Sequence, residues 1–216
     1  MTRQFFAFTI IVGAATAIAA DAERLKDAEL VLTEMAGAGD AGIPTNLLQK
    51  AKCVVVVPSL KKLALGIGGQ YGRGYVSCRR DGGWSAPGAI RVEGGSFGLQ
   101  IGGSATDVIL LVMNERGMDK LLSNQFKVGA DAAVAAGPVG REASAQTDIT
   151  MRAEMLAWSR SRGVYAGIAL QGSTLRQDSG ENKELFGREI SNREIVTGKV
   201  PVPAVALAFV KALSKY

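Results

Sequence analysis

The sequence predicts a single α+β domain with a largely antiparallel β-sheet, barrel-like or sandwich-like, and helices at the N- and C-terminal ends. Segments with the composition of strands follow one another through short glycine-rich turns in the middle of the chain. Helical periodicity is found mainly near the two ends of the chain. No repeat of roughly 20–50 residues and no linker divides the 216 residues, so one domain is the simplest organisation.

Two helices are expected before the sheet begins. From Asp21 to Met35, apolar residues recur at positions 25, 28, 32 and 35, which places them on one helical stripe. A loop with three glycines then reaches position 42. Pro44 is a favoured first-turn residue and indicates a short second helix that ends near Ala51.

Strands dominate the rest of the chain. The β-branched run Val54–Val57 is stopped by Pro58 and predicts a buried strand, and Asp81–Gly83 predicts a turn. Asn114 is a candidate helix cap. Further strands are expected at residues 63–71, 74–78, 89–92, 96–101, 107–112, 128–136, 153–159 and 164–170, and helices at residues 114–122 and 203–213.

Composition restricts the chemistry of this chain. The sequence contains no histidine, which excludes Ser-His-Asp and Cys-His nucleophile pairs and histidine-ligated zinc. Ser96 lies in a G-x-S-x-G pattern, but a hydrolase built on it would lack a base for the serine proton. A dinucleotide loop is also excluded, because Tyr71 stands where the third glycine is required. We therefore expect a non-enzymatic protein with no catalytic residues, no metal and no cofactor.

The first 20 residues have the features of a signal peptide. Arg3 precedes an uncharged apolar stretch, Phe5–Ala15, and Ala17–Ala19 provides the small-x-small cleavage pattern. We expect cleavage near Ala19 or Ala20 and a periplasmic or secreted protein. The alternative is a retained anchor, although an apolar run of 16 residues is shorter than the roughly 20 that span a bilayer. The predicted organisation is a signal peptide (1–20), an N-terminal helix and loop (21–42) and a globular domain (43–216).

Two cysteines and two aspartates have open interpretations. Cys53 and Cys78 could form a disulfide in an oxidising compartment, or remain two buried thiols, and strand register cannot be read from the sequence. Asp107 and Asp131 lie in apolar stretches and could form a paired-carboxylate site. We favour a structural role in which each accepts hydrogen bonds from the backbone or an arginine in the core, with Arg141 as a candidate partner.

The positive charge of the chain is local. Residues 43–80 contain seven Lys and Arg and no acid, whereas residues 21–42 carry a net charge of −4. Each surface cation contributes about 1 kcal/mol near an acidic membrane. Half of the seven would give only about millimolar affinity, so an apolar contact must add to the charge. The alternative is a solvated basic loop. Nucleic acid is not an expected partner, because aromatic residues are few and export is predicted.

A series of motifs, in order along residues 43–215, resembles the SYLF domain family. Each motif is weak alone, and together they are specific. They are Ile43-Pro44, Gly72-Arg73-Gly74, Gly83–Pro87, Gly95–Gly102, Thr106–Val108, Gly129–Asp131, Ala136–Arg141, Ser159–Gly167 and Leu170–Gly172.

The resemblance implies a lipid-binding module. Eukaryotic SYLF domains bind phosphoinositides and membranes through a basic surface and an N-terminal amphipathic segment, and some fungal members bind actin filaments. Exported bacterial relatives are described as lipid-binding proteins. One departure is the net acidic helix before Gly37, since a membrane-binding helix is normally rich in lysine. The expected head-group contacts are Lys50, Lys52, Lys61, Lys62 and Arg73, and the expected apolar contacts are Leu60 and Leu63.

We therefore expect reversible binding to anionic phospholipids or other anionic amphiphiles at a membrane surface. The alternative is a scaffold that binds another envelope protein through its sheet or its C-terminal helix, without dependence on lipid.

Overall fold

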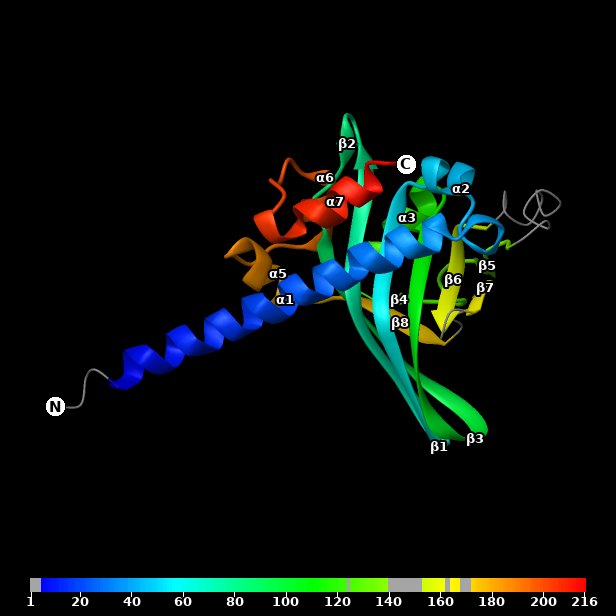
Figure 1. The fold of residues 1–216 in the computed structure, drawn as a ribbon, viewed down its shortest axis with the longest axis horizontal. Helices are drawn as coiled ribbons and strands as arrows, with labels where there is room; N and C mark the ends of the chain where they lie inside the picture. The colour runs from blue at the N-terminus through cyan, green and yellow to red at the C-terminus, as the bar shows by residue number, and fades with distance from the viewer. Residues whose placement is uncertain (1–4, 124, 140–152, 162–163, 168–171) are drawn as a thin grey trace.

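The computed structural model describes residues 5–123, 125–139, 153–161, 164–167 and 172–216 (Figure 1). It confirms the predicted fold class: one α+β domain with a large, curled, mostly antiparallel sheet and helices at both ends. The first part contains α1 (Phe5–Gly37), η1 (Gly39–Ala41), α2 (Thr45–Lys50), β1 (Cys53–Arg80), β2 (Gly83–Trp84), β3 (Gly88–Val112) and α3 (Glu115–Leu121). The second part contains β4 (Phe126–Lys127), β5 (Val134–Ala136), β6 (Met155–Ser161), β7 (Val164–Gly167), β8 (Ser173–Gln177), α5 (Ser179–Phe186), α6 (Asn192–Thr197), η3 (Ala204–Ala206) and α7 (Leu207–Leu213).

A long two-stranded ribbon formed by β1 and β3 organises the sheet. The two strands are antiparallel partners from Cys53↔Val112 to Val76↔Gly88, with register shifts after Val57 and Leu65. The sequence predicted three separate strands within β1. They form one strand because the intervening glycine-rich residues remain extended and allow the ribbon to bend instead of ending it. In Figure 1 the ribbon projects from the body and folds back at its far end.

The folding back brings the two ends of β1 together. The Arg79 amide donates a hydrogen bond to the Lys52 carbonyl oxygen at 2.7 Å. Close to this point, Gly74 lies so near Val56 that a Cβ added to it would be 2.0 Å from the Val56 carbonyl oxygen. Only glycine fits this approach of one backbone to another.

The other strands extend both halves of the ribbon. The first half of β3 pairs with β8, and its second half pairs with β6. β4 pairs with β8, and β7 pairs with β6, both antiparallel. β5 pairs with β6 in the parallel direction. The curl of this sheet leaves an inner and an outer face.

Both faces of the sheet are covered. Val55 and Val57 belong to an inner cluster with Phe126, while Val54 and Val56 belong to an outer cluster with residues of α1, α2 and α7. A strand buried on both faces reads as a continuous apolar run, which explains the four consecutive valines. The predicted stripe at positions 25, 28, 32 and 35 of α1 is buried in the outer cluster, as expected.

α1 is one continuous helix that begins before the predicted signal-peptide boundary. Ala20 is exposed, whereas Asp21, the next residue of the helix, is buried. The N-terminal part of the helix extends away from the rest of the molecule (Figure 1). Among the described residues, no helix is both long enough and apolar enough to span a membrane.

A capping side chain marks the start of each of the short helices α3, α5 and α6, but only α3 was predicted. Asn114 caps α3 by accepting a hydrogen bond from the Gly117 amide, as expected. α5 and α6 were not predicted, although Asp178 and Ser191 cap them in the same way. Each of these two caps is followed three residues later by a glutamate, which is a recognisable helix-start pattern.

Candidate functional site

The two cysteines are joined, which decides between the two interpretations left open by the sequence. Cys53 and Cys78 form a disulfide. Cys53 is the first residue of β1 and Cys78 lies near the end of the same strand, 25 residues later. The two cysteines meet only because β1 folds back on itself. The bond therefore fixes the base of the ribbon.

Asp107 has the structural role that we favoured. Its carboxylate accepts hydrogen bonds from the Ser59 amide at 2.9 Å and from Nε and Nη2 of Arg160 at 3.0 and 2.6 Å. The arginine is therefore Arg160, and Arg141 lies outside the described residues. Ser59 has φ 52°, a backbone conformation that is uncommon for residues other than glycine. Asp107 thus holds the bulge that separates Val57 from Leu60.

The expectation for Asp131 was wrong in its location. Its side chain is exposed, and it accepts a hydrogen bond from the Lys127 amide at 2.6 Å, so it closes a surface turn and is not a core residue. It lies in the loop after β4, whereas Asp107 lies in β3, and the two share no hydrogen-bond partner among the described residues. The two aspartates do not form a paired-carboxylate site.

Two of the five predicted head-group contacts are consecutive residues of the ribbon, so their side chains point to opposite faces of it. Lys61 is exposed and Lys62 half-buried, opposite Ala105 and Ser104 of β3. They follow directly after the bulge at Ser59, which Asp107 holds. No hydrogen bond or ion pair joins the side chain of either lysine to any residue that the structure describes. Both ammonium groups are therefore available to an external ligand.

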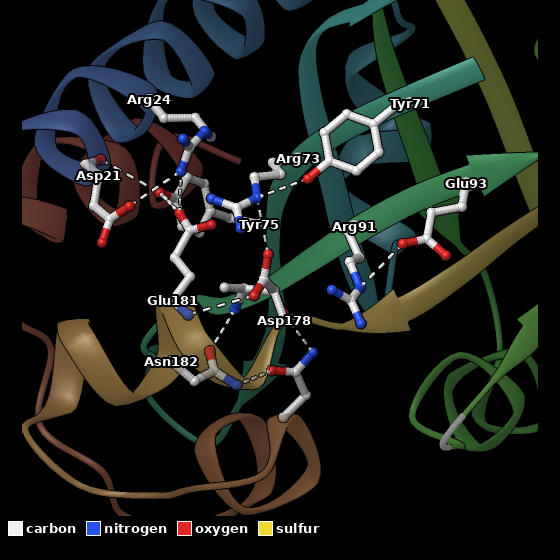
Figure 2. A network of polar contacts seen from close by, with 12 residues as sticks. Asp21, Arg24, Tyr71, Arg73, Tyr75, Arg91, Glu93, Asp178, Glu181 and Asn182 are labelled. Carbon is white, nitrogen blue, oxygen red and sulfur yellow. Dashed lines mark hydrogen bonds and ion pairs between the residues drawn. The ribbon is translucent and has the colours of Figure 1, made fainter. Parts of the chain in front are cut away.

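The remaining predicted contacts are elsewhere or already paired, so the expectation of one continuous basic surface is corrected. Lys50 is the last residue of α2 and Lys52 directly precedes β1, so roughly 30 Å of extended strand separates them from Lys61. Lys52 forms an ion pair with Glu115 at 2.9 Å. Arg73 Nε lies 3.0 Å from Asp178 Oδ2 and also donates to the Tyr71 hydroxyl at 3.0 Å (Figure 2).

The predicted apolar contacts also need correction. Leu60 is only 1% exposed and belongs to the inner core cluster, because the bulge at Ser59 turns its side chain inward. It cannot touch a bilayer in this structure. Leu63 lies in β1 opposite Gly103, but its side chain is outside the described part of the molecule.

Sequence reasoning missed the uncharged end of the ribbon. Residues 63–72 of β1 and 94–106 of β3 contain no Asp, Glu, Lys or Arg. These segments pair with one another and form the projecting end of the ribbon (Figure 1). The signal was present as two charge-free, glycine-rich stretches, but their proximity depends on the register of the strands. We call these 23 residues the ribbon end.

A groove lies between α1 and the part of β1 that borders the ribbon end. It has a volume of about 320 Å³. Glu23, Arg24 and Asp27 line it from α1, and Lys61 and Arg73 line it from β1. The acidic face of the N-terminal helix therefore lies opposite the basic strand, although their charges are far apart in sequence.

Arg24 belongs to a buried polar network behind this groove (Figure 2). Its Nη1 donates to Glu181 Oε1 at 2.6 Å and to Asp21 Oδ1 at 3.1 Å, and the Tyr75 hydroxyl also donates to Glu181 Oε1. Burial, followed by the negative charge of Glu181 and the neighbouring Glu184, raises the pKa of Asp21 to about 7. Burial and Glu181 also raise the pKa of Tyr75. The tyrosine hydroxyl is therefore a permanent donor at neutral pH.

Comparison with known proteins identifies the family. Residues 93–216 match the Ysc84 family model, described as "Las17-binding protein actin regulator". This chain belongs to the Ysc84 family. The resemblance to SYLF domains is thereby confirmed.

Curated Ysc84 relatives are similar over most of this chain. An SH3 domain-containing protein of Schizosaccharomyces pombe is 32% identical over 168 residues, which is 76% of this chain and 39% of the relative. Protein YSC84 of Saccharomyces cerevisiae is 31% identical over 171 residues, 77% of this chain and 36% of the relative. SH3 domain-containing YSC84-like protein 1 of Rattus norvegicus is 31% identical over 179 residues, 82% of this chain and 52% of the relative. This Ysc84-family chain therefore spans about a third to a half of these relatives.

The printed names of the Ysc84 relatives point to binding or scaffold proteins and not to enzymes. A LAS seventeen-binding protein 3 of Saccharomyces cerevisiae is 33% identical over 172 residues. The family match begins at Glu93, so it includes β3 from that residue onward and the C-terminal helices but not Lys61 or Lys62. A role for these lysines has to be argued from their position in this chain.

Proposed function

We propose that this chain binds anionic lipid head groups reversibly at a membrane surface and performs no chemistry on them. The observation that carries the proposal is the position of Lys61 and Lys62. Neither side chain has a partner among the described residues, and both lysines border the ribbon end, whose 23 residues are uncharged. Cations beside an uncharged projection are the combination needed to hold a protein at a bilayer interface.

The energetics require both parts. Two surface lysines contribute about 2 kcal/mol near an acidic membrane, which corresponds to binding in the range of tens of millimolar. Burial of about 200 Å² of apolar surface by the ribbon end would add about 5 kcal/mol. The sum of about 7 kcal/mol corresponds to a dissociation constant of about ten micromolar. Binding of this strength is reversible and sensitive to salt.

The groove is consistent with a head group beside Lys61. Arg73 and Arg24 also line it, but each already contacts a buried carboxylate, of Asp178 or Glu181. Lys61 is therefore the cation that a ligand phosphate would meet first. The acidic side chains of Glu23 and Asp27 on the opposite wall would disfavour deep entry by a second negative group.

We also propose that the protein works in the periplasm or outside the cell, peripheral to a membrane. The signal-peptide features of residues 1–20 and the disulfide at the base of the ribbon support an oxidising compartment. In that location the ligands would be envelope phospholipids or other anionic amphiphiles.

Vesicle flotation tests the lipid proposal. We expect the protein to float with vesicles that contain phosphatidylglycerol at low salt, and to float much less with pure phosphatidylcholine. Lys61→Glu with Lys62→Glu should abolish flotation. The matched control is Lys50→Glu with Lys52→Glu, which makes the same change of charge at the other end of the ribbon. No flotation of the native protein, or equal loss in both double variants, would contradict the proposal.

A protein partner is the second candidate. Val205 and Leu207 near the C-terminus are 40% and 57% exposed and lie two residues apart in the sequence. Relatives of this chain are named as Las17-binding proteins. This candidate predicts a complex with an envelope protein that persists at moderate salt without lipid and is lost in Leu207→Glu. Pull-down from an envelope extract with the native and variant proteins distinguishes it from lipid binding.

A further inference from the structure

A buried cluster at the start of the folded body contains more negative than positive charge. The side chains of Asp21 and Glu181 are 4% and 1% exposed, and both contact the guanidinium of Arg24 (Figure 2). No second cation forms an ion pair with either carboxylate within the described part of the chain. Two buried acids therefore share one arginine.

Two oxygens of this cluster lack hydrogen-bond partners. Asp21 Oδ2 and Glu181 Oε2 are buried and accept no hydrogen bond from any described residue. Tyr75 donates a hydrogen bond to Glu181 but brings no charge. Arg73, the next arginine, already contacts Asp178. Buried carboxylates are normally paired and fully hydrogen-bonded, so the arrangement lacks one positively charged donor.

The cluster lies at the boundary where cleavage of the leader is predicted. The bonds 19–20 and 20–21 are the candidate cleavage sites, and Ala20 is exposed while Asp21 is 3% exposed. The part of α1 before this point extends away from the body (Figure 1). The buried Asp21 is thus the first or second residue of the predicted processed chain.

We propose that the α-ammonium group released by proteolytic removal of the leader is the missing cation of this cluster. Hydrolysis of one peptide bond consumes one water and leaves a carboxylate on the leader and an amine on Ala20 or Asp21. At the pKa of an ordinary α-amine, just under 8, this group is largely protonated at neutral pH, and adjacent carboxylates favour the charged form.

Covalent geometry places the new charge in the cluster. The amine of residue 21 is within about 4 Å of its own side-chain carboxylate, and an amine on residue 20 is within about 7 Å. A cavity of about 210 Å³, lined by Asp21, Glu184 and Pro203, adjoins the cluster and leaves room for water around the ammonium. The helix N-terminus itself disfavours a cation, so the attraction of the carboxylates has to exceed this effect.

The consequence is a fold that becomes more stable when the leader is removed. With residues 1–20 attached, the cluster can reduce its excess charge only by binding a proton, as the raised pKa of Asp21 indicates. After cleavage the ammonium supplies the charge, and both carboxylates can remain ionised. This inference rests on the proposed export and removal of residues 1–20, and it is independent of lipid binding.

The first test is the N-terminus of the exported protein. The full chain is produced with its leader in a bacterial host, isolated from the periplasm and analysed by intact mass and N-terminal sequencing. We expect a chain that begins at Ala20 or Asp21. A retained leader, or a start beyond Arg24, would overturn the proposal.

The second test compares the processed chain, which begins at Ala20 or Asp21, with the same chain preceded by ten uncharged Gly and Ser residues. This extension moves the α-amine away from the buried cluster. We expect the native N-terminus to raise the Tm at pH 7.5 by about 3–6 °C, and Asp21→Asn or Glu181→Gln to reduce this difference to about 1 °C. Glu23→Gln is the matched control, because Glu23 is an exposed acid on the same helical turn, and it should keep the full difference. An equal Tm with and without the extension, or a difference that persists in Asp21→Asn, would overturn the proposal.

Discussion

The two ends of the β1–β3 ribbon have the same antiparallel pairing but different surroundings. At the base, the sheet is buried on both faces, and a disulfide joins the two halves of β1. At the ribbon end, charged residues are absent and glycine is frequent, and the border is marked by two lysines whose side chains have no partner among the residues that the structure describes. The difference shows that one pair of strands can supply both the buried core of a domain and an uncharged end that projects from it.

The largest expected effect on stability comes from adding one methyl group to a glycine at the base, compared with the same change at the ribbon end. Gly74→Ala at the base should prevent stable folding or cost more than about 3 kcal/mol, because the new Cβ would lie 2.0 Å from the Val56 carbonyl oxygen. Gly69→Ala, in the ribbon end, is the matched control and should change stability by less than about 0.5 kcal/mol, since the nearest atom is 3.9 Å away. Urea unfolding measures both. Similar costs at the two sites would mean that the base is not more tightly packed.

The second effect concerns the disulfide. Replacement of Cys53 and Cys78 by serine should lower the free energy of unfolding by about 3 kcal/mol, as expected for a bridge that closes a loop of this length. Flotation with acidic vesicles should persist below the melting temperature, because the ribbon end keeps its sequence. Loss of flotation in a folded double variant would show that the base controls the geometry of the far end.

The third effect tests the polar network at the base through pH. In the chain with residues 1–20 attached, the folded pKa of Asp21 is about 7 and the unfolded value is near 4. The corresponding stabilisation is complete below about pH 4 and is lost as the pH rises to 7. A shift of this size allows at most about 4 kcal/mol, and we expect about 2 kcal/mol because of the adjacent cavity. Urea titrations from pH 4 to 8 should show the decrease, and Asp21→Asn should remove most of it.

The smallest effect on stability belongs to the lysines. Lys61→Ala and Lys62→Ala should each change the free energy of unfolding by less than about 0.5 kcal/mol, because neither side chain has a described partner. Their effect should appear in vesicle binding. A loss of more than about 1 kcal/mol in thermal unfolding would indicate that the lysines belong to the base and not to the border of a binding surface.

Features that depend on nearby residues could be predicted from the sequence. The four valines at positions 54–57, the buried stripe of α1 and the cap at Asn114 each follow from periodicity or from a single turn of chain. The fold class followed from the order of these local patterns. The family was identified in the same way, from short motifs in order.

Features that depend on the folding back of the ribbon could not be predicted. Arg73 meets Asp178, 105 residues later in the sequence, and Asp107 holds the bulge at Ser59, which turns Leu60 into the core. No periodicity encodes such contacts. Of the five predicted basic contacts, only Lys61 and Lys62 are adjacent and without a described side-chain partner, and of the two predicted apolar contacts only Leu63 lies in the ribbon end.

The register of the ribbon also orders the events of folding. Partners nearest the turn, Val76 and Gly88, are 12 residues apart, whereas Cys53 and Val112 are 59 apart. Loop closure favours short sequence separations, so strand pairing should begin near the turn and then extend toward Cys53 and Val112. The two cysteines can approach each other only after the whole ribbon has formed and folded back on itself. Protection of their thiols from an alkylating reagent would then time the last step of assembly.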